Sequence, residues 1–409
     1  MEGLLNDRNL IADGGPPHAL ESLYPDRPRR VQTLFGPIGL RRAYYHHRAA
    51  RTGRCPLDEA LDLVRGCTPA LARLICRASS SSGSYQDAAR DLAAYTGLEM
   101  ESRHFGRLVA EIAPALRQAH ESLAPARAQA PICYVASDGT GVPMRKEELA
   151  GAKGRAPDGG ARTREVKLGC VFFQTATGEH GEPMRDPDST TYVATFGGAR
   201  AAGTLLRQEA LRRGYGDARQ TVYLGDGAPW VWENRRLNFP DAVEILDFYH
   251  ASEHVGELAG ALFGPGTAAA KEQQSAWCKR MKSESTTPVI QEARALAQQI
   301  DPALEPQRRQ NADRELGYLQ DNESRTRYGE FRARGYFIGS GVVEAGCKTV
   351  VGRRLKASGM FWSQRGAEDL LSLRCLILGP HFDAAWKARA PILAAQRARA
   401  RRWLSPSPN

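Results

Sequence analysis

Residues 132–140 read ICYVASDGT, and residues 221–227 read TVYLGDG. Each segment is an apolar run ending in Asp-Gly, which is typical of a buried β-strand that stops at a turn. A buried strand that ends in a bare carboxylate is costly unless a positive charge lies beside it. Two such strands side by side therefore predict a shared cation between Asp138 and Asp226. For either segment alone, the alternative is an ordinary turn aspartate.

Further strand patterns occupy residues 165–174, 189–197 and 242–250, and an amphipathic helix pattern occupies residues 199–216. The order of three strands, helix, strand, helix and strand predicts an α/β fold. Residues 251–335 have a helical pattern rich in Ala, Gln and Glu. A helix of small residues then begins near residue 339 and carries Glu344.

Glu344 would complete an open, oxygen-rich site with the two aspartates. Mg²⁺ suits such a site because it is a hard ion that binds through a few carboxylates and substrate phosphate. Two ions about 4 Å apart would serve phosphodiester cleavage or transfer. Basic residues follow Glu344 directly, as expected where a nucleic-acid backbone is the substrate. These residues are Lys348, Arg353, Arg354 and Lys356.

The chain has 409 residues and a formal net charge of +10, with 47 Arg and nine Lys. Its near-average composition excludes low-complexity and wholly disordered classes. The net charge is +3 over residues 1–130, −1 over 131–339 and +8 over 340–409, and the stretch from Arg27 to Leu57 holds eight Arg and no acid. Two basic regions around a near-neutral middle indicate a polyanion binder. A solvated basic surface is the alternative.

The N-terminal basic region combines a hairpin pattern with helices. Residues 30–45 alternate around a Gly-Pro turn, which predicts a β-hairpin. Residues 84–113 have the spacing of a helix-turn-helix, although helical hairpins are also common in proteins that never bind DNA. The DNA contacts expected from this region are Arg41, Arg42, Arg103 and Arg107.

Cysteine usage and hydropathy indicate the compartment. No apolar stretch of 18 residues is present and no signal-peptide pattern opens the chain, so we expect no membrane association. The eight Cys are scattered without a CxxC pair, which suits a reducing cytosol. His46, His47 and Cys55 could ligate a metal, but a solvated loop is the interpretation we favour.

Four blocks of sequence resemble the transposases of the ISKra insertion-sequence family. They are SDGTGVP (137–143), LGDGAPWVW (224–232), ILDFYHASEHV (245–255) and GSGVVEAGCKTVVGRRLKASGMFWS (339–363). The resemblance covers roughly residues 30–385 and includes TLFGPIGLRRAYY and CPLDEAL near the start. It implies a DDE core of RNase H-like fold with a helical insertion, and metal-dependent cutting and joining of DNA ends.

Carried over by resemblance, Asp138 and Asp226 are the catalytic aspartates and Glu344 is the glutamate, together holding two Mg²⁺ or Mn²⁺ ions. Asp247 and His250 match an Asp-x-x-His motif of related transposases and are expected to be auxiliary. Relatives carry Cys pairs near the N-terminus that suggest zinc, whereas this chain keeps only Cys55 with nearby His. The expected partners are double-stranded DNA, as terminal inverted repeats and target, and a second copy of the chain in a homodimer. The expected location is the prokaryotic cytoplasm, at the nucleoid.

The fold expected from these features is an RNase H-like mixed sheet preceded by a DNA-binding hairpin and helices. Its expected parts are a loose N-terminus (1–29), a DNA-binding region (30–130), the first part of the core (131–250), a helical insertion (251–338), the last part of the core (339–385) and a basic tail (386–409).

Three other functions fit parts of the pattern. A domesticated copy would bind DNA without cleaving it, but all three carboxylates are present. A structure-selective nuclease on the same fold would release its product rather than join it. A phosphatase of the haloacid-dehalogenase type needs a second Asp two residues from the nucleophile, where Asp138 has Ala136 and Thr140.

Overall fold

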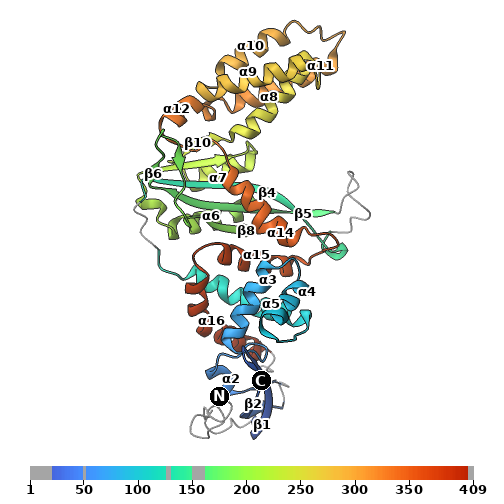
Figure 1. Ribbon diagram of the computed structural model, residues 1–409, viewed down its shortest axis with the longest axis vertical. Helices are drawn as coiled ribbons and strands as arrows, with labels where there is room; N and C mark the ends of the chain where they lie inside the picture. The colour runs from blue at the N-terminus through green and yellow to red at the C-terminus, as the bar shows by residue number, and fades with distance from the viewer. Residues whose placement is uncertain (1–20, 49–51, 126–129, 150–161, 404–409) are drawn as a thin grey trace, which may run out of the picture. The chain divides into compact units, whose positions relative to one another are not determined.

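The computed structural model describes residues 21–48, 52–125, 130–149 and 162–403 (Figure 1). Contacts between residues divide the chain into two compact units. Unit 1 comprises residues 1–123, 143–162 and 352–409, and unit 2 comprises residues 124–142 and 163–351. Among the described helices, none is both long and apolar enough to cross a membrane. All eight cysteines lie in the described ranges, and each is a free thiol.

Unit 2 is built on a five-stranded sheet. In sheet order its strands are β10 (Val243–Leu246), β9 (Gln220–Gly225), β4 (Ile132–Pro143), β5 (Thr163–Gln174) and β8 (Thr191–Thr195). β10 pairs parallel with β9, and β9 pairs parallel with β4, whereas β5 and β8 are antiparallel. A separate antiparallel pair is formed by β6 (Ala176–Thr177) and β7 (Pro183–Met184). The predicted α/β class with a mixed sheet is confirmed.

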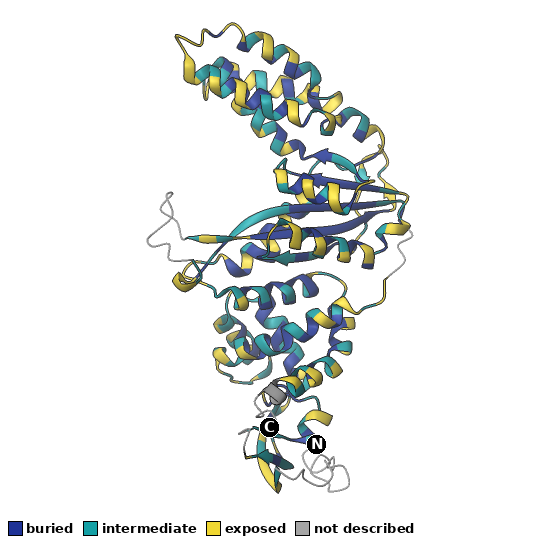
Figure 2. Ribbon diagram, turned by 180° about the vertical axis from the view of Figure 1, so that it is seen from behind, coloured by how far each residue is buried: buried dark blue, intermediate teal, exposed yellow. Residues whose placement is uncertain are grey.

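Helices cover both faces of this sheet. On β5, a Cβ at Gly169 would meet Leu206 of α6 (Ala199–Arg212), whereas its neighbour Leu168 contacts Gly346 of α13 (Gly341–Gly346). Successive residues of a strand point to opposite faces, so α6 and α13 lie on opposite sides. The strands between them are buried along most of their length (Figure 2). Tyr134, Phe172 and Tyr223 are among the largest fully buried side chains.

A bundle of helices follows β10, as the helical pattern of residues 251–335 predicts. Its members are α8 (Phe248–Phe263), α9 (Ala268–Ser283), α10 (Thr287–Ala297), α11 (Pro306–Asp321) and α12 (Tyr328–Ala333). The bundle packs mainly through α8, which contacts both α9 and α11. The last predicted strand is shorter than expected, because Asp247 ends it and caps α8.

Unit 1 begins with a sheet of β1 (Glu21–Thr33), β2 (Gly36–His47) and β3 (Thr52–Arg54). The predicted hairpin is therefore confirmed and is longer than expected. Residues 21–29, expected to be loose, instead extend its first strand, because they pair with residues 40–47. The expected loose residues 1–20 lie outside the described ranges.

The predicted helix pair of unit 1 is also confirmed. α4 (Tyr85–Thr96) ends at Gly97, whose φ of 71° is left-handed, and α5 (Ser102–Glu121) follows. A left-handed residue after a helix is usually Gly because it has no Cβ to clash. Helix α3 (Pro69–Ser81) packs against both helices of this pair, whereas α2 (Pro56–Ala60) contacts β2.

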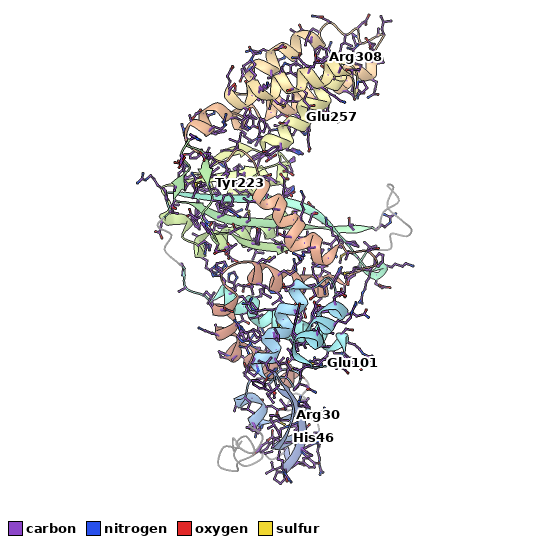
Figure 3. All side chains as sticks on the ribbon, in the orientation of Figure 1. Arg30, His46, Glu101, Tyr223, Glu257 and Arg308 are labelled. Carbon is purple, nitrogen blue, oxygen red and sulfur yellow. The ribbon has the colours of Figure 1, made fainter. Side chains whose placement is uncertain are left out.

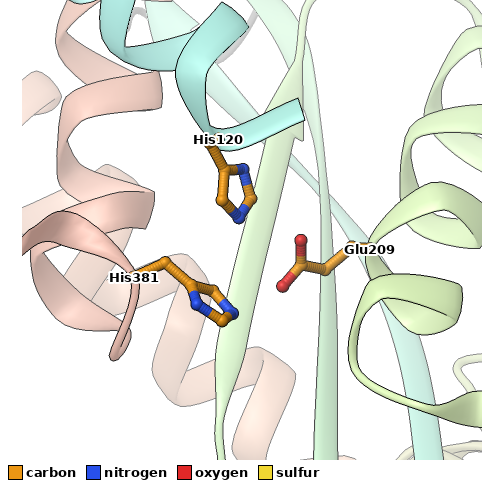
Figure 4. A group of neighbouring side chains, drawn as sticks. All are labelled: His120, Glu209 and His381. Carbon is orange, nitrogen blue, oxygen red and sulfur yellow. The ribbon is translucent and has the colours of Figure 1, made fainter. Parts of the chain in front are cut away.

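The C-terminal helices complete the core of unit 1. They are α14 (Arg353–Leu355), α15 (Gln364–Leu378) and α16 (Phe382–Trp403). Residues 352–385, expected in the core with the carboxylates, instead pack here, because Leu373, Leu376 and Phe382 bury their side chains in the cluster formed by α3, α4 and α5. His120 on α5 and His381 before α16 place their rings 5.1 Å apart, centroid to centroid (Figure 4).

Candidate functional site

Asp138 lies on the central strand of the unit 2 sheet. The parallel pairing between β4 and β9 stops at Ala136, two residues before Asp138. β4 itself continues to Pro143. Asp138 therefore lies within the strand, whereas the Asp-Gly turn pattern predicts that it lies at the end of the strand. Asp138 nevertheless lies just past the paired segment, and its side chain is only partly buried.

Asp226 directly follows the neighbouring strand β9. Its Oδ1 accepts a hydrogen bond of 3.0 Å from the Ala228 N–H, which orients the carboxylate. Its backbone carbonyl accepts a hydrogen bond of 2.9 Å from the Tyr318 hydroxyl. Gly227 has φ +95°, and a Cβ there would lie 2.3 Å from the Tyr318 hydroxyl oxygen. Only glycine fits this position, so the Asp-Gly pair has a structural reason at Asp226.

Glu344 reaches the site from helix α13. The Ser340 hydroxyl donates to Glu344 Oε1 at 2.9 Å, one turn earlier on the same helix. Gly346 lets α13 approach the sheet, because a Cβ there would lie 2.7 Å from Tyr192 and 2.9 Å from Leu168. The predicted small-residue helix is thus confirmed, with Gly346 as the position that needs a small residue. A π-helical segment at Cys347–Gly352 follows.

The charges of Asp226 and Glu344 act on Asp138. Burial raises the pKa of Asp138, hydrogen bonds from the Cys347 thiol and the Gly139 N–H lower that pKa, and the negative charges of Asp226 and Glu344 raise it. Within the described ranges, no Lys, Arg or His forms an ion pair with any of the three carboxylates. However, no set of three oxygens, one from each of these carboxylates, lies within 4.8 Å of one another. The sheet and α13 therefore gather three acids without a cationic side chain to balance them.

Asp247 ends β10 but has a different environment. Its side chain is 1 % exposed. Oδ1 accepts from the His250 N–H at 2.6 Å, and Oδ2 accepts from the Ser340 N–H. Asp247 thus joins the start of α8 to the residue that begins the Glu344 helix. Its hydrogen bonds occupy both oxygens, so we describe it as a positioning residue.

His250 is partly exposed, and its neighbours come from the helical bundle. Its Nδ1 lies 3.6 Å from Glu253 Oε2, and its ring lies 5.1 Å from that of His254, centroid to centroid. His254 stacks on Tyr318 at 3.6 Å between centroids. The buried carboxylate of Glu315 holds His254 Nδ1 at 2.6 Å. Sequence analysis missed Tyr318 and Glu315, and the only signal for His254 was its place one turn after His250.

The basic residues expected to contact DNA fall into two groups. Arg103, Arg107, Lys348, Arg353 and Lys356 are exposed. Arg41 is 67 % exposed by its side chain but pairs with Asp26.

Two other expected contacts are buried, which corrects the prediction for both. Arg42 is 8 % exposed and lies 3.3 Å from Asp58, measured from Nε to Oδ1. Arg354 is 1 % exposed, donates to the Ser79 carbonyl at 3.0 Å and stacks on Tyr85. A buried guanidinium group that already has such partners is a packing residue of unit 1 and is not placed to contact DNA.

The N-terminal Cys and His residues do not gather into a metal group in the described part of the chain. Cys55 is buried, and its thiol contacts the Arg42 guanidinium. Burial raises the pKa of Cys55, which disfavours the thiolate form that binds zinc.

Part of the chain is similar to a family of proteins. The family described as Uncharacterised protein family (UPF0236) matches residues 22–154, which is less than half of the chain. This stretch contains the hairpin, α2 to α5 and the part of β4 that carries Asp138. No curated protein matches the chain.

Proposed function

We propose that this protein is a DNA transposase of the DDE type, similar to the transposases of ISKra insertion sequences. The observation that carries the proposal is the placement of Asp138, Asp226 and Glu344 around one sheet of unit 2. Asp138 lies on β4, Asp226 directly follows the adjacent parallel strand β9, and Glu344 lies on a helix packed against the same sheet. The strand order, with β4, β5 and β8 to one side and β9 and β10 to the other, supports an RNase H-like core.

The donor set fits divalent ions such as Mg²⁺ or Mn²⁺. All three side chains offer hard oxygen donors, and none is neutralised by a basic side chain of the described ranges. Oxygens of the three carboxylates do not all lie within 4.8 Å of one another, which suits two ions better than one shared ion. Bound ions would activate the attacking oxygen and stabilise the leaving oxygen of a phosphodiester.

Hydrogen bonds within the chain orient two of the three carboxylates. Ala228 N–H orients Asp226, and Ser340 Oγ orients Glu344, so each carboxylate keeps its other oxygen for a ligand. The Asp247 carboxylate fixes the start of the Glu344 helix through the Ser340 N–H. His250, partly exposed on the first turn of α8, has its ring 6.2 Å from that of Tyr318, centroid to centroid, and is proposed as an auxiliary contact to substrate. Pre-set ligands reduce the reorganisation that cleavage requires.

The proposed substrates are the terminal repeats of the element and a target duplex. Two ends must be held together for transfer, so the proposed active form is a homodimer, working at the nucleoid. The experiment is cleavage of a duplex that carries the repeats flanking the gene, in Mg²⁺ or Mn²⁺. We expect nicking at the element end by the parent protein and none by Asp138→Asn. Equal nicking by both proteins would refute the assignment.

A second candidate is a copy that binds DNA without cleaving it. The exposed arginines of unit 1 favour DNA binding irrespective of catalysis. A gel shift that weakens steeply with salt, with no cleavage in any divalent metal, would favour this candidate over the transposase.

A further inference from the structure

A cavity of about 390 Å³ opens on unit 1, where strand β1 of the hairpin meets the start of helix α5. Figure 3 labels Arg30 on the hairpin and Glu101 before α5, which both line it. Five arginines and two glutamates are among its lining residues. The arginines are Arg29, Arg30, Arg65, Arg103 and Arg107.

Three of these arginines are already neutralised. The Nη1 of Arg29 lies 2.8 Å from Asp58, the Nε of Arg65 lies 2.6 Å from Glu111, and the Nε of Arg103 lies 3.0 Å from Glu101. Such pairs hold the walls of the cavity in place but leave little positive charge for a ligand.

Arg30 and Arg107 differ from the other three. Both are exposed, and within the described ranges neither has an ion pair or a side-chain hydrogen bond. Arg30 comes from β1 and Arg107 from the second turn of α5, so the fold brings together two uncompensated guanidinium groups that are far apart in sequence. Glu99, on the same lining, is the one acid there without an ion pair in the described ranges.

His104 also lines the cavity, and nearby positive charges affect its pKa. Burial lowers its pKa first, and the charges of Arg65 and Arg107 lower it further. Its ring Nε2 lies 3.4 Å from the Cys67 thiol. The His104 imidazole therefore provides a hydrogen-bonding group in the lining of the cavity.

We propose that this cavity binds the phosphate backbone of double-stranded DNA through Arg30 and Arg107. Guanidinium groups match phosphate oxygens with two parallel hydrogen bonds, and an unpaired guanidinium loses no existing partner on binding. Duplex DNA is the partner because the inference rests on the proposed function, and the cavity lies at the second helix of the predicted helix-turn-helix. The proposal adds Arg30 to Arg107, which the sequence already predicts as a DNA contact, and leaves out the buried Arg42.

The test uses the full-length protein and a fluorescent duplex of about 30 base pairs, with anisotropy measured from about 50 to 300 mM NaCl. The double variant Arg30→Gln/Arg107→Gln should bind at least about tenfold more weakly, and the slope of log Kd against log salt should fall by about two. Each single variant should lower the slope by about one. The matched control is Arg236→Gln, an exposed arginine of unit 2 paired with Glu233, which should bind within about twofold of the parent.

Unchanged affinity and salt slope in the double variant would overturn the inference. A parent protein that fails to bind duplex DNA would overturn it together with the proposed function. If the parent cleaves DNA and the double variant binds normally, the cavity assignment alone fails. If the double variant loses binding but no protein cleaves in any metal, the cavity assignment stands and the transposase proposal fails.

Discussion

The ends of strands β9 and β10 carry two aspartates in different environments. Asp226, after β9, uses one carboxylate oxygen for the Ala228 N–H and has no ion pair within the described ranges. Asp247, after β10, is 1 % exposed and accepts backbone N–H groups with both oxygens. The strands are adjacent and parallel, so the difference comes from what packs beyond them. A carboxylate with a free oxygen beside other acids is suited to bind a ligand. A carboxylate whose two oxygens both accept hydrogen bonds from the backbone stabilises the fold.

The largest expected effect comes from Asp226→Asn. The substitution keeps the size of the side chain but removes the charge that would hold a metal ion, so DNA cleavage should fall by about 10³-fold or more. The melting temperature should change little, because the Ala228 N–H can still bond to the amide oxygen. Cleavage rates under single-turnover conditions measure the effect. Cleavage within tenfold of the parent would contradict the assignment of Asp226.

The opposite result is expected for Asp247→Ala. The substitution leaves the His250 and Ser340 N–H groups without their acceptor in a buried place, which costs about 2 kcal/mol or more. Thermal unfolding should shift down by about 4–8 °C. Metal binding by the folded protein should persist, although the Glu344 helix loses its anchor. An unchanged melting temperature together with lost metal binding would make Asp247 a ligand instead.

A smaller effect is expected from Tyr318→Phe. The loss of the hydroxyl removes the hydrogen bond to the Asp226 carbonyl and leaves the stacked ring in place. The Mg²⁺ concentration for half-maximal cleavage should rise about tenfold, with kcat at saturating metal within about threefold. The matched control is Tyr249→Phe, since Tyr249 is 65 % exposed on α8. Equal metal dependence in both variants would show that Tyr318 does not position Asp226.

The smallest effect concerns stability without metal. The folded-state pKa of Asp138 is raised by burial and by Asp226 and Glu344, so the folded state is less stable at pH values above that pKa, where Asp138 is charged. Asp138→Asn removes this cost and should raise the melting temperature by about 2 °C near neutral pH. The gain should shrink as the pH falls toward about 4, where the unfolded carboxyl also binds a proton. A lower melting temperature at neutral pH would mean that the charged carboxylate stabilises the fold.

Sequence patterns predicted the candidate site residues that are marked by their immediate neighbours in the chain. The apolar run before Asp-Gly located Asp138 and Asp226, and the small residues around Glu344 reflect the close approach of Gly346 to the sheet. Tyr318 was missed because its partner lies 92 residues earlier in the chain, and nothing in the pattern of α11 marks that contact.

The basic residues show a second limit of sequence patterns. The run of basic residues predicts that both Arg353 and Arg354 contact DNA. The packing of unit 1, which the run does not reveal, exposes Arg353 and buries Arg354. Helical periodicity identifies the apolar face of a helix but not the helix that packs against it. The packing of α15 against α3 and α5 could therefore not be predicted from the residues of α15.

The most direct test of the central claim is a calorimetric titration of the full-length protein with Mn²⁺ in the absence of DNA. If Asp138, Asp226 and Glu344 form a two-ion site, the parent should bind about two ions, and Asp138→Asn and Asp226→Asn should each weaken or abolish this binding. The control, Asp383→Asn, changes an exposed carboxylate that is paired with Arg73 and should bind as the parent does. Equal Mn²⁺ binding by the parent and both site variants would contradict the claim.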